Sequence, residues 1–251
     1  MMNKTLAAYV IQIADNNLIL AQRLGELCGH AATIETDIAL TNISLDLFGQ
    51  VRSYFQYAAS LTGAEATEDT IAFLRVENEY KNALLVEQPN TDFAYVIARQ
   101  CFYDHFHLLF LQKLQHSSDE TLRAIASKAI KEVTYHVRFS SDWLIRLGDG
   151  TEESHNKITQ AVQDLWVYTN ELVTAAPIEI EMADAGIGVN PESFRDEYYG
   201  ALTSILNEAT IPVPEQKYFQ KGGKQGIHTE HMGYILTEMQ YMQRTYPNMT
   251  W

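Results

Sequence analysis

Two side chains with metal-ligand chemistry stand three residues apart inside an apolar run of the sequence. In FYDHFHLLF, residues 102–110, Asp104 and His107 are flanked by aromatic and aliphatic side chains. Residues at i and i+3 share one face of an α-helix. A carboxylate and an imidazole on one buried face supply part of the ligand set with which helical bundles hold a pair of iron ions. The pair therefore raises the question of whether it belongs to a working metal site.

Other segments offer further candidate ligands. Glu132 and His136 stand one turn apart in KEVTYH, and Asp46 lies in a long helical segment upstream. A carboxylate-bridged di-iron site takes a Glu from each of two helices and a Glu-x-x-His pair from each of the other two. The matching register of the fourth long segment reads QDLWV, residues 163–167, and contains no histidine. The ligand set is therefore incomplete.

We expect these inward polar groups to form a metal-free network of hydrogen bonds and ion pairs. A buried carboxylate without a partner costs several kcal/mol, so a compensating cation or hydrogen-bond donors are required. Lys131, Arg138 and Arg52 are cationic candidates. A working di-iron site, which would make the protein an oxygenase in its own right, and a site for a single metal ion are the alternatives.

Two other groups of residues have ligand-like spacing. Glu152 and His155 form the one literal Glu-x-x-His pair, directly after the GDGT turn, where we expect a helix start with acidic first-turn residues. His228, Glu230 and His231 could ligate a metal, but such a cluster more often caps a helix. We expect the capping role in both places.

The elements that must position these residues are helical. Strand and hairpin signals are scarce, and residues 1–88 and 90–176 contain no proline. Apolar periodicity, caps and glycine stops predict helices over 4–27, 34–62, 68–80, 92–116, 119–147, 153–174, 178–185, 191–207 and 229–245. Four of these, over 34–62, 92–116, 119–147 and 153–174, have the length of a four-helix bundle.

The sequence thus predicts an all-α protein with one domain over residues 1–251. Its bundle core would cover about 34–174, and a C-terminal extension would cover about 175–251. In the segment 34–62 the apolar spacing predicts an inner face formed by Ile38, Leu45 and Phe48.

Composition excludes several classes of function. The net charge of −14 argues against nucleic acid and anionic membranes as partners. The sequence holds two cysteines outside any CxxC pair, no signal-peptide pattern and no apolar run long enough to span a membrane, so we expect a cytoplasmic protein. It also lacks a P-loop, a GxSxG motif and a Rossmann fingerprint.

The C-terminal part carries two more features. KGGK, from Lys221 to Lys224, is either a plain flexible turn or a phosphate-binding loop. The helix after it is amphipathic, and its Met- and Tyr-rich stripe suits either an interface or packing on its own bundle. The interface candidates are Tyr234, Met239, Tyr241 and Met242.

Four blocks of the sequence together carry a resemblance to a known family. QRLGELCGHAATIETDIALTNISLDLFGQVR, NALLVEQPNTDFAYVIARQ, KAIKEVTYHVRFS and GGKQGIHTEHMGYILTEMQYMQR resemble the C-subunit family of the bacterial phenylacetyl-CoA epoxidases over essentially the whole chain. The resemblance implies a ferritin-like four-helix bundle with additional N- and C-terminal helices. It also implies a multicomponent monooxygenase that uses oxygen and NADPH to epoxidise the ring of phenylacetyl-CoA in phenylacetate catabolism.

In that family the di-iron site belongs to a related catalytic A subunit, and the C subunit is its structural partner. The resemblance therefore implies a non-catalytic chain without a cofactor of its own, in a hetero-oligomer with the A subunit and other subunits. Lys221 and Lys224 would be candidates for contacting the coenzyme A phosphates. The ligand-like positions would be vestigial; they are Asp46, Asp104, His107, Glu132 and His136. A ferritin-type storage bundle is a third interpretation, but the internal carboxylates are too few for it.

Overall fold

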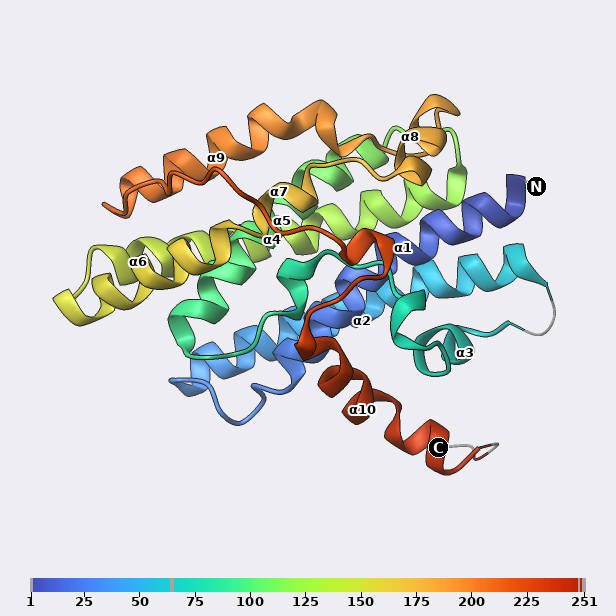
Figure 1. Cartoon of the computed structure of the whole chain (residues 1–251), viewed down its shortest axis with the longest axis horizontal. Helices are drawn as coiled ribbons and strands as arrows, with labels where there is room; N and C mark the ends of the chain where they lie inside the picture. Colours follow the sequence, from blue (N-terminus) through green and yellow to red (C-terminus); the bar gives the residue numbers. More distant parts are fainter. Residues whose placement is uncertain (1, 64–65, 248, 250–251) are drawn as a thin grey trace. The chain divides into compact units, whose positions relative to one another are not determined.

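The computed structural model describes residues 2–63, 66–247 and 249, and every regular element within them is a helix. The α-helices are α1 (Met2–Gly25), α2 (Ile34–Thr62), α3 (Glu68–Phe73), α4 (Phe93–Leu114), α5 (Glu120–Gly148), α6 (Glu152–Trp166), α7 (Thr169–Leu172), α8 (Pro177–Asp184), α9 (Arg195–Glu208) and α10 (Glu230–Thr245) (Figure 1). Short 3-10 helices are η1 (Glu77–Glu79), η2 (Leu84–Glu87), η3 (Pro191–Phe194) and η4 (Gly223–Gln225). The predicted all-α class is confirmed, and this helical content is consistent with a ferritin-like fold. Across the described residues, no helix combines the length and the apolar character needed to cross a membrane.

The chain forms two compact units. One unit combines the chain up to Glu87 with the chain from Gly222 onward, and the other comprises Gln88–Lys221. The single domain over 1–251, with its core over about 34–174 and its extension over about 175–251, stays a prediction. The chain from Gly222 onward nevertheless packs with the N-terminal helices of its own unit, since α10 contacts α1 and α3.

In the first unit, α1 packs along α2 and is buried on almost every side (Figure 1). Its central polar residues are buried and bonded to the loop after α3. The Asp15 carboxylate accepts a hydrogen bond from the Arg75 guanidinium at 2.9 Å, and the Asn16 side-chain oxygen accepts one from the Ala83 amide at 2.8 Å. These residues interrupt the apolar run because they hold a distant segment of the chain.

The inward face of α2 differs from the predicted one. Ile38 and Leu45 are exposed, and Phe48 is only partly buried. Because the residues that pack inward lie on another side of the helix, the prediction of Ile38, Leu45 and Phe48 as the inner face is wrong. The buried apolar residues of α2 are Leu40, Ile43, Leu47, Val51, Tyr54, Phe55 and Ala58.

In the second unit, α4 is the central helix and packs against α5, α6 and α9. The helix predicted over 153–174 is interrupted after Trp166, where α6 ends. The Thr169 hydroxyl donates to the Trp166 carbonyl at 2.9 Å, and the Gln220 amide donates to the Val167 carbonyl at 2.8 Å. These bonds take carbonyls that a continuing helix would use, so the fourth long helix is shorter than expected.

The other predicted helices agree more closely with the structure. The segment 34–62 matches α2 at both ends, with Thr33 as the N-cap and Gly63 at the C-cap. The segment 68–80 is too long, because α3 ends at Phe73. In the segment 191–207, the first residues form the 3-10 helix η3 before α9 begins.

Candidate functional site

Asp104 and His107 belong to the second unit, and both side chains are buried, as their apolar sequence context predicts. Asp92 caps the start of α4, its carboxylate accepting from the Tyr95 amide at 3.0 Å. Most of α4 is buried, and Asp104 and His107 are among its buried residues. A polar pair on a helix packed from several sides has to be bonded locally or kept neutral.

The carboxyl group of Asp104 is held by two neutral donors. One oxygen accepts a hydrogen bond from the side-chain amide of Gln100 at 2.6 Å, and the other accepts one from the Ser140 hydroxyl of α5 at 2.8 Å. Burial raises the pKa of Asp104 to about 6, while the nearby His136 and the two hydrogen bonds lower it in part. Both oxygens are thus engaged within the protein, and the group titrates close to neutrality.

His107 is kept neutral. Burial, together with the charge of His136, lowers the pKa of His107 to about 3. Among the described residues, neither of its ring nitrogens has a hydrogen-bond partner, and the ring packs beside Tyr103 with centroids 5.3 Å apart. The imidazole therefore behaves as a packed ring rather than as half of an ion pair with Asp104.

The remaining ligand-like residues do not complete a metal centre. His136 is fully buried on α5, Glu132 on the same helix is partly exposed, and Asp46 belongs to the first unit, where it is partly exposed. Nowhere in the described chain do three or more His, Cys, Asp or Glu side chains form a group that could hold a metal ion. A di-iron centre needs bridging carboxylates with free oxygens, and both oxygens of Asp104 are already bonded. The residues present do not fit such a centre.

The Glu-x-x-His pair at the start of α6 is part of a helix terminus. Thr151 is the N-cap and accepts from the Ser154 amide at 3.2 Å, while Glu152 lies in the acidic first turn. The His155 ring donates to the Gly148 carbonyl at 2.7 Å. This ring therefore ties the end of α5 to the start of α6, and the predicted role at a helix start is confirmed.

The HTEH segment is bonded to one buried carboxylate, Glu87. The His228 ring nitrogen Nδ1 lies 2.6 Å from one Glu87 oxygen, and the Thr229 amide and hydroxyl donate to the other at 2.8 and 2.6 Å. Asn82 donates to the first oxygen at 2.9 Å. Thr229 occupies the N-cap position of α10, but its side chain bonds Glu87 rather than the helix.

The two nitrogens of His228 both face acceptors. Nε2 lies 3.0 Å from the Tyr80 carbonyl, opposite the Glu87 contact of Nδ1. Burial acts to lower the pKa of His228, but the hydrogen bond and charge of Glu87 and the Tyr80 carbonyl outweigh it and raise the pKa. The protonated ring is the form that this arrangement favours.

The glycines of KGGKQG allow a close approach between two loops of the first unit. A Cβ on Gly223 would lie 2.1 Å from the Asn82 carbonyl oxygen, and one on Gly226 would lie 2.3 Å from the Asn78 carbonyl oxygen. Lys224 is buried and Lys221 is exposed. The contact of both lysines with coenzyme A phosphates stays a prediction.

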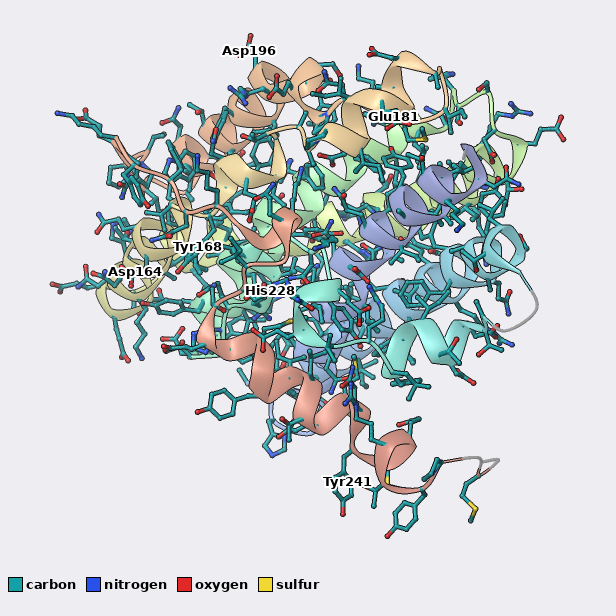
Figure 2. The ribbon with its side chains drawn as sticks, turned by 45° about the vertical axis from the view of Figure 1, so that its right-hand side comes forward. Asp164, Tyr168, Glu181, Asp196, His228 and Tyr241 are labelled. Carbon is teal, nitrogen blue, oxygen red and sulfur yellow. The ribbon has the colours of Figure 1, made fainter. Side chains whose placement is uncertain are left out.

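Two helices of the first unit expose large apolar side chains. On α10, Tyr234, Tyr241 and Met242 are exposed, whereas Met239 is buried; Figure 2 shows Tyr241 pointing away from the ribbon. The interface role of these four residues stays a prediction. The exposed apolar face of α2 is formed by Ile34 together with Ile38 and Leu45, two residues that the apolar spacing assigns to the core. The seven-residue spacing of Ile38 and Leu45 is the available signal, and it fits a core as well as a surface.

Comparison with known proteins places these features in a family. The family model described as phenylacetic acid catabolic protein matches residues 1–251. The chain is 50% identical over 246 residues to the C subunit of the 1,2-phenylacetyl-CoA epoxidase of Escherichia coli (strain K12), and the match covers 98% of this chain and 99% of that protein. On both grounds, the chain belongs to the phenylacetic acid catabolic protein family.

Proposed function

We propose that this chain is the non-catalytic, structural subunit of a multicomponent phenylacetyl-CoA 1,2-epoxidase acting in aerobic phenylacetate catabolism in the cytoplasm. The observation that carries the proposal is the 50% identity to the C subunit of such an epoxidase over nearly the full length of both chains. The complex would use oxygen and NADPH, and a separate catalytic A subunit would carry its di-iron centre.

The side chains around Asp104 support a non-catalytic role. Gln100 and Ser140 hold both of its oxygens, and His107 is neutral and packed, so this cluster resembles an internal polar network more than a set of free ligands. Such a network can fix the packing of α4 against α5 while the outer helices bind a partner.

Pairing would stabilise the catalytic subunit by mass action, because a partner that binds only the folded state shifts the folding equilibrium. The exposed apolar side chains of α2 and α10 are the candidate contact surfaces. Burial of such side chains is the usual source of affinity in stable subunit interfaces.

The test is reconstitution from separately purified subunits. The catalytic subunit, with its reductase components, should epoxidise phenylacetyl-CoA faster and stay soluble longer when this chain is added. Elemental analysis of this chain alone, after incubation with ferrous iron, should give close to no bound iron per chain. About two irons per chain, with activity in the absence of the catalytic subunit, would instead establish a di-iron oxygenase in its own right.

A further inference from the structure

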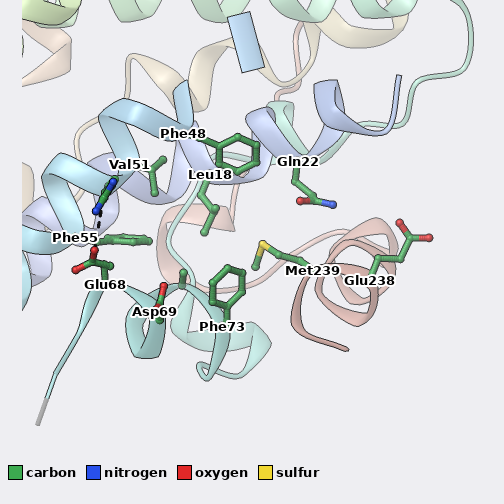
Figure 3. A pocket seen from close by; sticks show the side chains of 12 residues that line it. Leu18, Gln22, Phe48, Val51, Phe55, Glu68, Asp69, Phe73, Glu238 and Met239 are labelled. Atoms are coloured by element: carbon green, nitrogen blue, oxygen red, sulfur yellow. Dashed lines mark ion pairs between the residues drawn. The ribbon is translucent and has the colours of Figure 1, made fainter. Parts of the chain in front are cut away.

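A groove of about 620 Å³ opens on the surface of the first unit between α1, α2, α3 and α10. Its floor is apolar and is formed by Leu18, Val51, Phe55, Phe73 and Met239. Figure 3 shows the side chains of Phe73 and Met239 turned toward Leu18. The volume lies within the roughly 300–1,000 Å³ of pockets that hold a bound group.

The rim of the groove is acidic. Glu68, Asp69 and Glu238 surround the floor, with Arg52 as the one cationic side chain among the lining residues. Arg52 is already paired with Glu68, their Nε and Oε1 atoms lying 3.5 Å apart (Figure 3). Asp69 and Glu238 have no ion-pair partner among the described residues, so the rim carries uncompensated negative charge beside an apolar floor.

We propose that this groove binds a segment of a partner subunit that inserts a large apolar side chain, flanked by a lysine or arginine, between α3 and α10. The apolar side chain would cover Leu18, Phe73 and Met239, and the cation would meet Asp69 and Glu238. This proposal rests on the proposed function, which requires a partner polypeptide, and it names the contact chemistry of that partner.

The charge of the groove selects among possible occupants. A coenzyme A thioester would bring phosphates against two carboxylates, which is unfavourable. A second copy of this chain, whose net charge is −14, would bring acidic surface against an acidic rim. A cationic partner segment gains from the same charges, which also speed its association.

The groove continues onto the exposed face of α2. Phe48 lines the groove, and Leu45 lies three residues earlier on the same side of the helix with 61% of its surface exposed. A partner segment anchored in the groove can therefore extend along an apolar surface instead of leaving into solvent.

The test measures the affinity of the purified catalytic subunit for this chain by isothermal titration calorimetry at low and high salt. Asp69→Lys with Glu238→Lys should weaken binding at least about tenfold at low salt and reduce its salt dependence. Gln22→Trp, which fills the groove from a partly exposed position on α1, should weaken binding by a similar factor at both salt concentrations. Glu181→Lys with Glu208→Lys is the matched control, since both residues are exposed carboxylates of the second unit, and it should bind within about twofold of wild type.

The occupant is identified by cross-linking. Phe73 is replaced with the photo-cross-linking residue benzoylphenylalanine, and the complex is irradiated. The cross-link should form to a partner residue that lies beside a large apolar side chain and within two residues of a lysine or arginine. Circular dichroism and urea unfolding of each variant establish that it is folded.

If wild type binds the catalytic subunit, and if the variant Asp69→Lys with Glu238→Lys and the variant Gln22→Trp bind it with the same affinity, the groove proposal is overturned and the proposed function stands. Cross-links to a second copy of this chain, or phenylacetyl-CoA binding to the isolated chain that Gln22→Trp abolishes, would overturn it in favour of another occupant. Absence of any binding between wild type and the catalytic subunit would overturn the proposed function and the groove proposal together.

Discussion

Glu87 and His228 are 141 positions apart in the sequence, yet their side chains lie 2.6 Å from each other and are completely buried. Glu87 ends η2, and His228 directly precedes Thr229, the N-cap residue of α10. This pair joins the two ends of the chain that make up the first unit.

The pair makes the stability of the first unit depend on pH. Because the pKa of His228 is raised in the folded state, its stabilisation is fully present below the unfolded value of about 6.5 and is lost as pH rises through the folded value. His228→Gln should therefore lower the free energy of unfolding by about 2 kcal/mol near pH 6 and by less at pH 9, measured by urea denaturation. His30→Gln, at an exposed histidine of the same unit, should have no such effect. A His228→Gln loss that grows with pH would contradict this assignment.

Asp104, like His228, should make the free energy of unfolding fall as pH rises, but it does so through a carboxyl group. Its pKa is raised to about 6 by burial, so the ionised form destabilises the fold as pH rises from the unfolded value of about 4 through 6. Asp104→Asn should gain about 1–2 kcal/mol relative to wild type between pH 5 and pH 8 in urea denaturation. Asp142→Asn, at an exposed carboxylate on α5, serves as the control and should show no comparable trend. Loss of bound iron from the Asp104→Asn protein would argue for a metal site instead.

Gly223 should be intolerant of any side chain. Its Cβ position meets the Asn82 carbonyl oxygen at 2.1 Å, so Gly223→Ala forces two loops apart and should cost about 1–3 kcal/mol of stability. Gly49→Ala is the matched substitution in the same unit: nothing lies within 4 Å of its Cβ position inside α2, and the change should stabilise by up to about 1 kcal/mol. Equal effects of the two changes in thermal unfolding would contradict the close packing at Gly223.

The exposed apolar face of α2 should matter for assembly rather than for folding. Ile38→Asp with Leu45→Asp should leave the urea midpoint of the isolated chain nearly unchanged, because both side chains are exposed. The same pair should weaken binding to the catalytic subunit about tenfold or more. Ile180→Asp on α8, which is also exposed, provides the control. Normal assembly by the α2 variant would exclude this face from the interface.

Lys221 offers a test of contact with the substrate. If this exposed lysine meets a coenzyme A phosphate, Lys221→Ala should raise the KM of the reconstituted complex for phenylacetyl-CoA by up to about fivefold without changing kcat. Lys217→Ala, four residues earlier and also exposed, controls for a general loss of positive charge. An unaltered KM would remove Lys221 from the substrate contacts.

The sequence predicted best those features that depend on neighbouring residues. The bounds of α2 follow from Thr33 and Gly63, and the inward position of Asp104 follows from its place in an apolar stripe. The end of α6 at Trp166 was not predictable, because the Gln220 amide that bonds the Val167 carbonyl comes from far along the chain.

The exposed residues of α2 show a second limit of periodicity. Ile38 and Leu45 repeat at helical spacing whether they face a core or a partner, and the spacing itself does not distinguish these cases. The role of Glu87 was missed for a related reason. A single carboxylate in a loop gives no sign that Thr229 and His228 will return to it.

The division of the first unit between both ends of the sequence has a consequence for synthesis. While the ribosome is still producing the chain, α1 and α2 can pair, but Glu87 cannot meet His228 and Thr229 until residues 88–229 have been made. The second unit is continuous in sequence and is complete before that point. A chain that stops before His228 therefore leaves the Glu87 carboxylate without its histidine and threonine partners, so the first unit depends on the later arrival of the segment from Gly222 onward.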